Sequence, residues 1–412
     1  MNSKVIIHLI KGLGIPSRLL EILSCYLMSL MIPTDKHTQV NAEKISGKDS
    51  SLFSRLLKNN LGLTGVILNR AARRAIQALM KKRRPLFEGA PWKIAIIIDA
   101  TLHERSSEKI ENSQKLNHGG GWVIGHQWTN IVILINDKTI PLPPIPFFTK
   151  KESEIREKKY LTSNEAIVNY LKTMPLKDIL GLHSQEEIVV LLDAGYDCKE
   201  IQNTILSRGW DFVASIKQTR SMRIEENDKW EQTQHYFGDG RRPWKILKIK
   251  IKDEEGKSRM YSVKQRETYI KGLSQKMRIV ASKRNHDKKV IFLLCSNLEI
   301  DIKKIIKCYS RRWRIEIFHR EIKSHLGLQD CGVSSFDSLN SHVHFVYLSY
   351  ILLKEFGEEL KVSGGIKFLQ EKLFNEIQIS QKKSLLSDLT KINGKEKVKT
   401  TCRSDIERLE AA

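Results

Sequence analysis

The stretch Cys308-Tyr-Ser-Arg-Arg-Trp-Arg-Ile-Glu-Ile-Phe-His-Arg-Glu-Ile-Lys323 decides how the rest of the chain is interpreted. At about 100° of rotation per helical residue, Tyr309, Arg312, Glu316 and Lys323 fall within an arc of roughly 60°. One face of the expected helix therefore carries a phenol, a guanidinium, a carboxylate and an amine, which suits a phosphodiester. Apolar residues on both sides predict that the acid lies at the edge of buried surface. A solvated charged face is the competing interpretation.

The composition points to a polyanionic partner. The chain has 412 residues, of which 41% are hydrophobic, so it is long enough for two or three domains with a real core. It carries 70 Lys and Arg against 47 Asp and Glu, a net charge of +23, which creates a positive field over much of the surface. No apolar run is long enough to span a bilayer, and residues 19–33 are expected to form a buried helix rather than a signal peptide. A membrane partner and secretion are therefore not expected.

The cysteines indicate a reducing compartment. The chain has six, and none of them forms a CxxC pair. Neither a zinc site nor a disulfide framework is therefore expected, and we predict a cytoplasmic protein that associates with the nucleoid when it is bound to DNA.

Residues 1–90 are expected to form a small helical domain that binds DNA. Apolar residues recur there at helical spacing. Within this domain, Ser46–Lys58 offers a turn, an N-cap and an amphipathic helix with polar residues on one side. A helix-turn-helix that reads DNA has this pattern, and so does an ordinary pair of surface helices. The sequence leaves both interpretations open.

Two buried strands are each followed by an acid. The run Lys93–Ile98 precedes Asp99, and the run Glu186–Leu192 precedes Asp193; both runs are rich in β-branched residues. Strands and helices alternate between them, which is typical of a mixed α/β sheet. Because open α/β sheets usually place their sites at strand ends, both acids are candidate site residues.

The remaining segments extend this predicted α/β domain, which covers residues 91–355. Residues 217–297 contain alternating strands punctuated by lysine and arginine, and we interpret them as a basic β insertion. Residues 356–412 are expected to form a C-terminal helical tail, a candidate for oligomerisation.

Asp99, Asp193 and Glu316 together predict a metal site. Acids near buried strands are costly to keep ionised unless a cation is bound between them. Three carboxylates without a Cys/His cluster prefer Mg²⁺ or Mn²⁺ to zinc. A pair of such ions can activate water on one side of a phosphodiester and stabilise the leaving 3′ oxygen on the other. For either aspartate alone, a cap or turn former is the competing interpretation.

The chain resembles the insertion-sequence transposases of the DDE class, whose catalytic domain is RNase H-like. Tyr309, Arg312, Glu316 and Lys323 match at every spacing the Tyr-x2-Arg-x3-Glu-x6-Lys signature of that family. The resemblance also covers Ile98-Asp99, Leu192-Asp193-Ala-Gly-Tyr196 and the β-rich stretch between the second acid and the glutamate.

The resemblance implies a cut-and-paste transposase. Asp99, Asp193 and Glu316 would hold the catalytic metals, and Tyr309, Arg312 and Lys323 would contact DNA near the element's terminal nucleotide. An insertion tryptophan, Trp230 or Trp244, would stack on a flipped base, although an ordinary core position is the competing interpretation for each. The partners would be double-stranded DNA, as terminal inverted repeats and as target, and a second copy of the chain in the synaptic complex.

Three residues near these motifs are given no catalytic role. His126 is interpreted as structural, and Asp197 as an acid at a helix N-terminus. His319 is expected to project toward the apolar side of its helix. Two other functions stay open beside the transposase: an RNase H-like nuclease that cuts without joining, and a non-catalytic DNA-binding remnant.

Overall fold

The computed structural model describes residues 4–118, 120–175, 179–180, 187–239, 246–252, 258–285 and 289–395. The chain divides into two compact units. One combines Met1–Ile67 with Glu321–Ala412, and the other is Leu68–Arg320. These boundaries are defined by packing. The functional domains expected from the sequence, residues 1–90, 91–355 and 356–412, stay a prediction. None of the described helices is long and apolar enough to cross a membrane.

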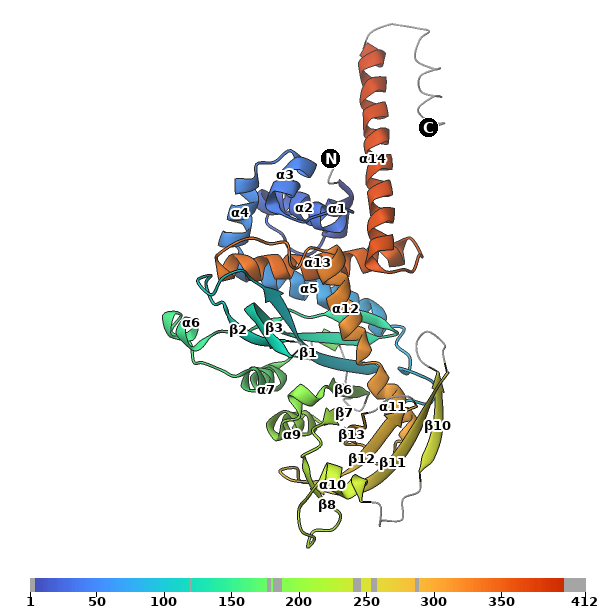
Figure 1. The fold of residues 1–412 in the computed structure, drawn as a ribbon. Coiled ribbons are helices and arrows are strands. Elements are labelled where there is room, and N and C mark those ends of the chain that lie inside the picture. The colour runs from blue at the N-terminus through green and yellow to red at the C-terminus, as the bar shows by residue number, and fades with distance from the viewer. Residues whose placement is uncertain are drawn as a thin grey trace. The chain divides into compact units, whose positions relative to one another are not determined.

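The Leu68–Arg320 unit is built on one mixed sheet (Figure 1). Its described strands are β1 Ile94–Glu104, β2 Gln114–His118, β3 Gly121–Ile135, β4 Lys138–Pro141, β5 Ile145–Pro146, β6 Ile188–Leu192, β7 Asp211–Ile216, β8 Ser221–Arg223, β9 Glu231–Gln232, β10 Leu247–Lys252, β11 Ser258–Ile270, β12 Lys276–Arg284 and β13 Ile291–Cys295. The order is β2-β3-β1-β6-β7-β13-β12-β11-β8-β9, with β4 and β5 paired to β3 and β10 paired to β11. The mixed α/β class expected from the sequence is confirmed.

The central strands are parallel and buried. β1 pairs in parallel with β6, and β6 pairs in parallel with β7. Residues 94–98 of β1 and all of β6 are buried, as their unbroken apolar runs predict for strands that are covered on both faces. From β7 the described sheet continues in antiparallel pairs through β13, β12 and β11. The strands with the two aspartates therefore lie in the interior of the sheet.

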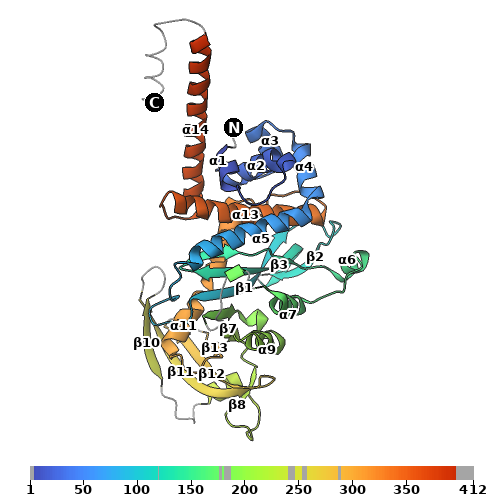
Figure 2. The ribbon, with the colours of Figure 1, turned by 180° about the vertical axis from the view of Figure 1, so that it is seen from behind.

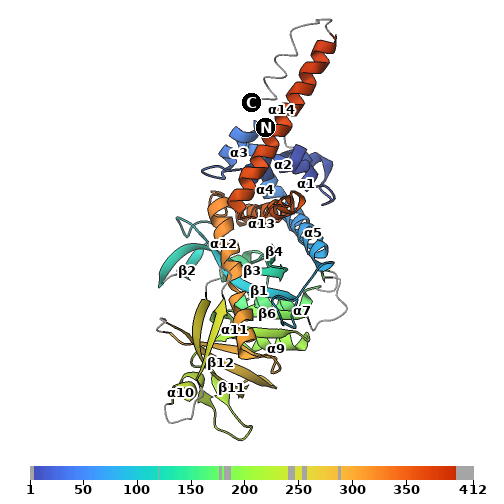
Figure 3. The ribbon, with the colours of Figure 1, turned by 90° about the vertical axis from the view of Figure 1, so that its right-hand side faces the viewer.

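Helices cover both faces of these central strands. The helices that lie wholly or mostly in this unit are α5 Leu61–Met80, α6 Lys150–Ile155, α7 Ser163–Thr173, the 3₁₀ helix η1 Ala194–Tyr196, α9 Lys199–Ser207, α10 Thr233–Gly238, α11 Ile302–Ser310 and α12 Trp313–His325. Figure 2 shows α7 and α9 side by side, and α9 packs on β7. Figure 3 shows α11 on the opposite side of the sheet, where it also packs on β7.

Asp99 does not close its strand, contrary to the expectation from the sequence. β1 continues to Glu104 and pairs with β3 along this whole length, while its described pairing with β6 ends at Ile98. An unbroken apolar run reveals where a strand is covered on both faces. It does not reveal the half-buried continuation, in which Thr101 and His103 are buried and Glu104 is exposed. Asp99 therefore lies directly after the last residue of β1 that pairs with β6.

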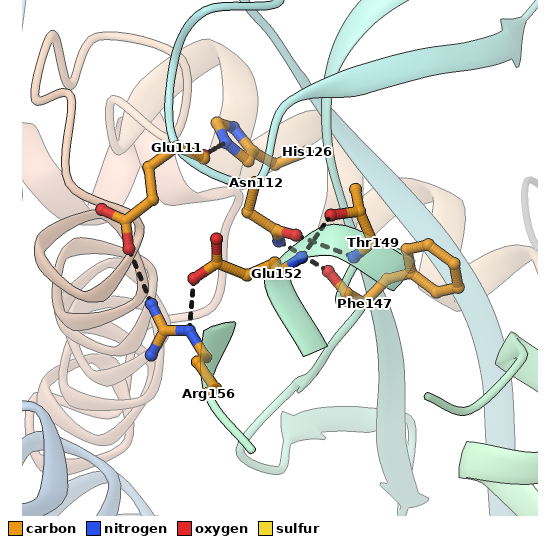
Figure 4. Close-up of polar contacts among 7 residues, drawn as sticks. All are labelled: Glu111, Asn112, His126, Phe147, Thr149, Glu152 and Arg156. Carbon is orange, nitrogen blue, oxygen red and sulfur yellow. Dashed lines mark hydrogen bonds and ion pairs between the residues drawn. The ribbon is translucent and has the colours of Figure 1, made fainter. Parts of the chain in front are cut away.

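A buried polar network fastens the extension of β1 and β3 (Figure 4). Asn112, with a positive φ of 57°, donates to the Phe147 carbonyl and accepts from the Thr149 N–H, each at 2.8 Å. The Nε2 atom of His126 lies 2.8 Å from the carbonyl oxygen of Glu111. Arg156 forms ion pairs with Glu111 and Glu152. The residues drawn are Glu111, Asn112, His126, Phe147, Thr149, Glu152 and Arg156. His126 thus has a structural contact here, in line with its interpretation from the sequence.

The unit that combines Met1–Ile67 with Glu321–Ala412 is helical. Its remaining helices are α1 Lys4–Leu9, α2 Ser17–Met31, α3 Gln39–Ser46, α4 Ser50–Asn59, α13 Phe336–Glu359 and α14 Ile366–Lys395. α13 packs against α2, α4 and α14. Inside this packing, the Tyr26 hydroxyl lies 2.9 Å from Nδ1 of His342, whose Nε2 lies 2.9 Å from the Gly327 carbonyl oxygen. Burial lowers the pKa of His342 to about 4, so the ring is neutral near pH 7.

α3 and α4 are two helices joined by a short turn. The turn passes through Gly47, which has a φ of 72°, and Asp49 caps α4 by accepting the Ser51 N–H. The apolar side of α4 is buried, whereas Arg55 and Lys58 are exposed. α2, α3 and α4 contact one another. This geometry is compatible with a DNA-reading helix pair.

Candidate active site

The parallel pairing of β1 with β6 aligns the two aspartates. Ile98 is paired with Leu192, so Asp99 and Asp193 follow at the same level on neighbouring strands. Neighbouring strands lie about 4.8 Å apart. Asp193 caps η1, because its Oδ1 accepts the Gly195 N–H. The cap interpretation therefore holds for Asp193, and its negative charge still acts on Asp99, whose pKa it raises.

Glu316 enters the site on α12 rather than on the single long helix that was expected over residues 308–323. α11 ends at Ser310, and α12 begins at Trp313. Across the break, the N–H groups of residues 311, 312, 314 and 315 bond to carbonyls three residues earlier, as in a 3₁₀ turn. Trp313 is 57% exposed and does not border the acid with buried surface. A periodicity argument assumes regular rotation, so it does not detect a tightened turn.

The Arg312 guanidinium lies between two of the acids. Its Nη1 is 3.2 Å from Oδ2 of Asp99, and its Nη2 is 3.3 Å from Oε1 of Glu316. Burial opposes the charge of this arginine, yet the neighbouring Tyr309, Asp99 and Glu316 raise its pKa above the ordinary value. One cation thus neutralises two carboxylates that come from distant parts of the chain.

The environment of Asp99 favours its protonated form. Burial raises the pKa of Asp99 to about 7; Arg312 opposes this rise, and Glu316 adds to it. The Ala100 N–H, which donates to Oδ1 at 2.9 Å, is a further opposing contact. Burial is the largest cause of the raised pKa, so the carboxyl lacks the solvation that would keep it ionised even with Arg312 beside it. The donor set therefore fits a divalent cation, which would return the acid to its ionised form.

His319 joins this group, although it was expected to project away from it. The ring is buried, but one of its nitrogens and oxygens of Asp99 and Glu316 lie within 4.8 Å of one another. The ring is held by Asn130, whose Nδ2 lies 2.7 Å from Nε2 of His319. Asn130 is opposite Asp99 in the β1–β3 pairing. The spacing of three residues from Glu316 on one helix was the signal for this placement.

The other expected DNA contacts are distributed over several elements. Tyr309 is at the end of α11 beside Arg312, with which its side chain forms a hydrogen bond. Burial raises the pKa of Tyr309, and Arg312 and Ser215 oppose this rise. Lys323 is on α12, seven residues after Glu316, within the other compact unit. Trp230 is 40% exposed, and the Arg223 guanidinium lies 4.6 Å from its ring centroid. Trp244 lies outside the described residues.

Asp197 lies directly before Cys198, the N-cap of α9, and its carboxylate also has specific partners. It accepts the Lys217 N–H at 2.9 Å and the Gln202 side-chain amide at 3.1 Å, and Arg220 lies 3.5 Å away. These partners tie the turn after β6 to the chain that follows β7. Asp197 thereby supports the loop that contains Asp193.

The hairpin between β3 and β4 holds the break between α11 and α12. The turn is formed by Asn136 and Asp137, which both have positive φ, at 50° and 63°. The carboxylate of Asp137 forms ion pairs with Arg311, at 2.5 Å, and with Arg314, at 3.8 Å. These two arginines flank Arg312, so the hairpin fixes the backbone from which its guanidinium reaches the acids.

We expect Asp137→Asn to reduce DNA cleavage on the order of tenfold, because small displacements of reacting groups are costly. Asparagine keeps the left-handed turn but loses the charge that holds the two arginines. Partly exposed ion pairs contribute little to folding, so the free energy of unfolding should fall by less than about 1 kcal/mol. Cleavage rates and urea denaturation measure the two effects. Glu88→Gln is the matched control, since it removes one exposed carboxylate and leaves the turn and both arginine contacts unchanged. Equal losses in the two variants would contradict the role of the Asp137 charge.

Together, the mixed sheet and the acids beside its parallel strands are compatible with an RNase H-like DDE catalytic domain. A comparison with protein families gives the same class: the model of the family described as "Transposase DDE domain" matches residues 93–352, more than half of the chain. The chain belongs to this family. Membership supports transposase function and implies that the chain binds DNA and uses divalent metal ions. No curated protein sequence matches the chain.

Proposed function

We propose that the protein catalyses cut-and-paste transposition, cleaving DNA at transposon ends and joining the freed strand to a target. The single observation that carries this proposal is the convergence of Asp99 and Glu316 on one cation position, with Asp193 at the same level on the next strand. These three acids would hold Mg²⁺ or Mn²⁺, as two ions. When bound, the ions would activate water and stabilise the leaving 3′ oxygen.

The chain's own residues would position the DNA. Arg312 and Lys323 would bind backbone phosphates near the element's terminal nucleotide, and Tyr309 would contact the same region. Trp230 is the described candidate for stacking on an extruded base, since part of its ring is exposed. Two transposon ends must be paired before transfer, so we propose a homodimer in the synaptic complex, with residues 356–412 as its candidate contact.

The α3–α4 pair is proposed to bind the terminal inverted repeats. Its second helix presents Ser51, Ser54, Arg55 and Lys58 on its exposed side, and the overall charge of +23 favours DNA. Contacts of the two basic side chains with phosphates would position this helix. The serines would contact bases by exchanging their present partners, since Ser51 accepts from Arg55 and Ser54 donates to Gln39.

We expect the double substitution of Arg55 and Lys58 by alanine to weaken DNA binding without changing the fold. Each lost phosphate contact should reduce the slope of log affinity against log salt by about 1. Fluorescence anisotropy across a salt series measures this slope. The control is the pair Lys36→Ala and Lys44→Ala, which removes the same charge from outside α4. An unchanged slope in the α4 variant would show that Arg55 and Lys58 do not contact the DNA phosphates.

The test of the proposed function uses labelled inverted-repeat DNA, Mg²⁺ and a target plasmid. We expect both donor cleavage and joined products from the wild-type chain. Donor cleavage without joining would favour a nuclease of the same fold, and binding without cleavage would favour a DNA-binding remnant. Asp193→Asn tests the metal assignment, because asparagine preserves the cap of η1 and removes only the charge. Unaltered cleavage by this variant would show that Asp193 caps η1 and does not hold a metal.

A further inference from the structure

Arg312 bonds the same two acids, Asp99 and Glu316, that would hold a metal. Its two terminal nitrogens reach one carboxylate each, at 3.2 and 3.3 Å. Oxygen atoms of the two acids lie within 4.8 Å of each other. A divalent ion bonds such oxygens at about 2.1 Å, so an ion shared by both acids would lie against the guanidinium. Two cations do not share this space without strong repulsion.

We propose that Arg312 is an exchangeable counter-ion, which neutralises Asp99 and Glu316 until the metal binds and then transfers to a phosphate of the DNA. This inference rests on the proposed function, because it takes the two acids as metal ligands. It adds that metal and DNA binding are coupled through one side chain.

The surroundings of Arg312 allow this exchange. Its backbone is held by the flanking Arg311 and Arg314, which pair with Asp137, so the side chain can change partner while the main chain stays in place. The guanidinium side chain is 14% exposed, which puts it near the surface on which DNA would lie. Guanidinium binds phosphate as well as carboxylate through paired N–H groups. A phosphate can therefore replace the two acids without leaving the arginine unpaired.

The exchange makes metal and DNA binding mutually reinforcing. In the DNA-free protein the metal must displace Arg312 from the acids, which weakens metal affinity. DNA supplies the displaced arginine with a new partner, so metal binds more tightly when DNA is present. By linkage, the metal strengthens DNA binding by the same factor. The site would thus be fully loaded only when the substrate is in place.

The affinity for MnCl₂, measured by the electron paramagnetic resonance signal of free Mn²⁺, tests this coupling. We expect Arg312→Gln to bind Mn²⁺ about tenfold more tightly than wild type in the absence of DNA. A short duplex of arbitrary sequence should tighten Mn²⁺ binding several-fold in wild type and less in the variant. Arg320→Gln is the matched control, because Arg320 is an exposed arginine on the same helix. Equal or weaker Mn²⁺ binding by Arg312→Gln, or an undiminished effect of DNA on it, would overturn the inference.

A second measurement is made on the wild-type protein and does not require that Arg312→Gln folds. The Nε–H resonance of Arg312 in ¹⁵N-labelled wild-type protein is assigned by its absence in Arg312→Lys. We expect Mg²⁺ to shift it, and a resonance that stays unchanged at saturating Mg²⁺ would overturn the exchange. Asp99→Asn distinguishes failure of the proposed metal site from failure of the exchange. If Asp99→Asn binds Mn²⁺ as tightly as wild type does, the proposed metal site is wrong. If Asp99→Asn weakens Mn²⁺ binding and Arg312→Gln leaves it unchanged, only the exchange is wrong.

Discussion

Glu316→Gln abolishes DNA cleavage and leaves DNA binding largely intact: this is the largest effect that we expect from a single substitution. Glutamine has the shape of the acid but no charge, so it would neither hold a divalent cation nor pair with Arg312 as strongly. Loss of one preorganised charged group from an active site costs on the order of 10³-fold in rate. Single-turnover cleavage of end-labelled DNA and anisotropy with the same duplex measure the two quantities.

The matched control is Glu299→Gln, which removes an exposed carboxylate just after β13. It should cleave and bind DNA as the wild type does. A loss of DNA binding in Glu316→Gln as large as its loss of cleavage would indicate that Glu316 holds the α11–α12 region in place rather than taking part in the chemistry.

In the absence of metal, the free energy of unfolding should fall as pH rises from about 4 to about 7. Over this range the folded state keeps a proton on Asp99 that the unfolded state has lost. The pKa of this acid is about 7 in the folded chain and starts from 3.8, so the folded state keeps a proton that the unfolded state has lost. Stability decreases with pH wherever the folded state binds more protons. The difference in pKa sets an upper limit of about 4 kcal/mol on this contribution.

Asp99→Asn tests this expectation directly. Asparagine cannot ionise, so the variant should lack this part of the pH dependence and should be more stable than wild type at pH 8 in the presence of EDTA. Urea denaturation at pH 5 and pH 8 measures the difference. Asp301→Asn is the control, since Asp301 caps α11 and asparagine caps equally well. The same slope in wild type and Asp99→Asn would show that the carboxyl is ionised throughout. Added Mg²⁺ should reverse the ranking at pH 8, because the cation stabilises only the ionised acid.

Arg312 shows why the contacts among the charged residues of the site were not foreseen from the sequence. Its position in the signature indicates contact with DNA, and helical periodicity places it near Glu316. Its second partner, Asp99, is more than 200 residues away, and no local pattern links the two. The same holds for the hairpin at Asp137, whose turn residues are readable from the sequence while its arginine partners are not.

The sequence by itself determined the mixed α/β class, the buried central strands and the three acids as candidates, because each depends on patterns that are local in the sequence. The tertiary structure alone decided that β1 continues past Asp99, that the helix breaks before Glu316, and that Asn130 holds His319 beside the acids. These features depend on which strands and helices pack together. Packing brings distant residues within bonding distance and leaves no regular trace along the chain.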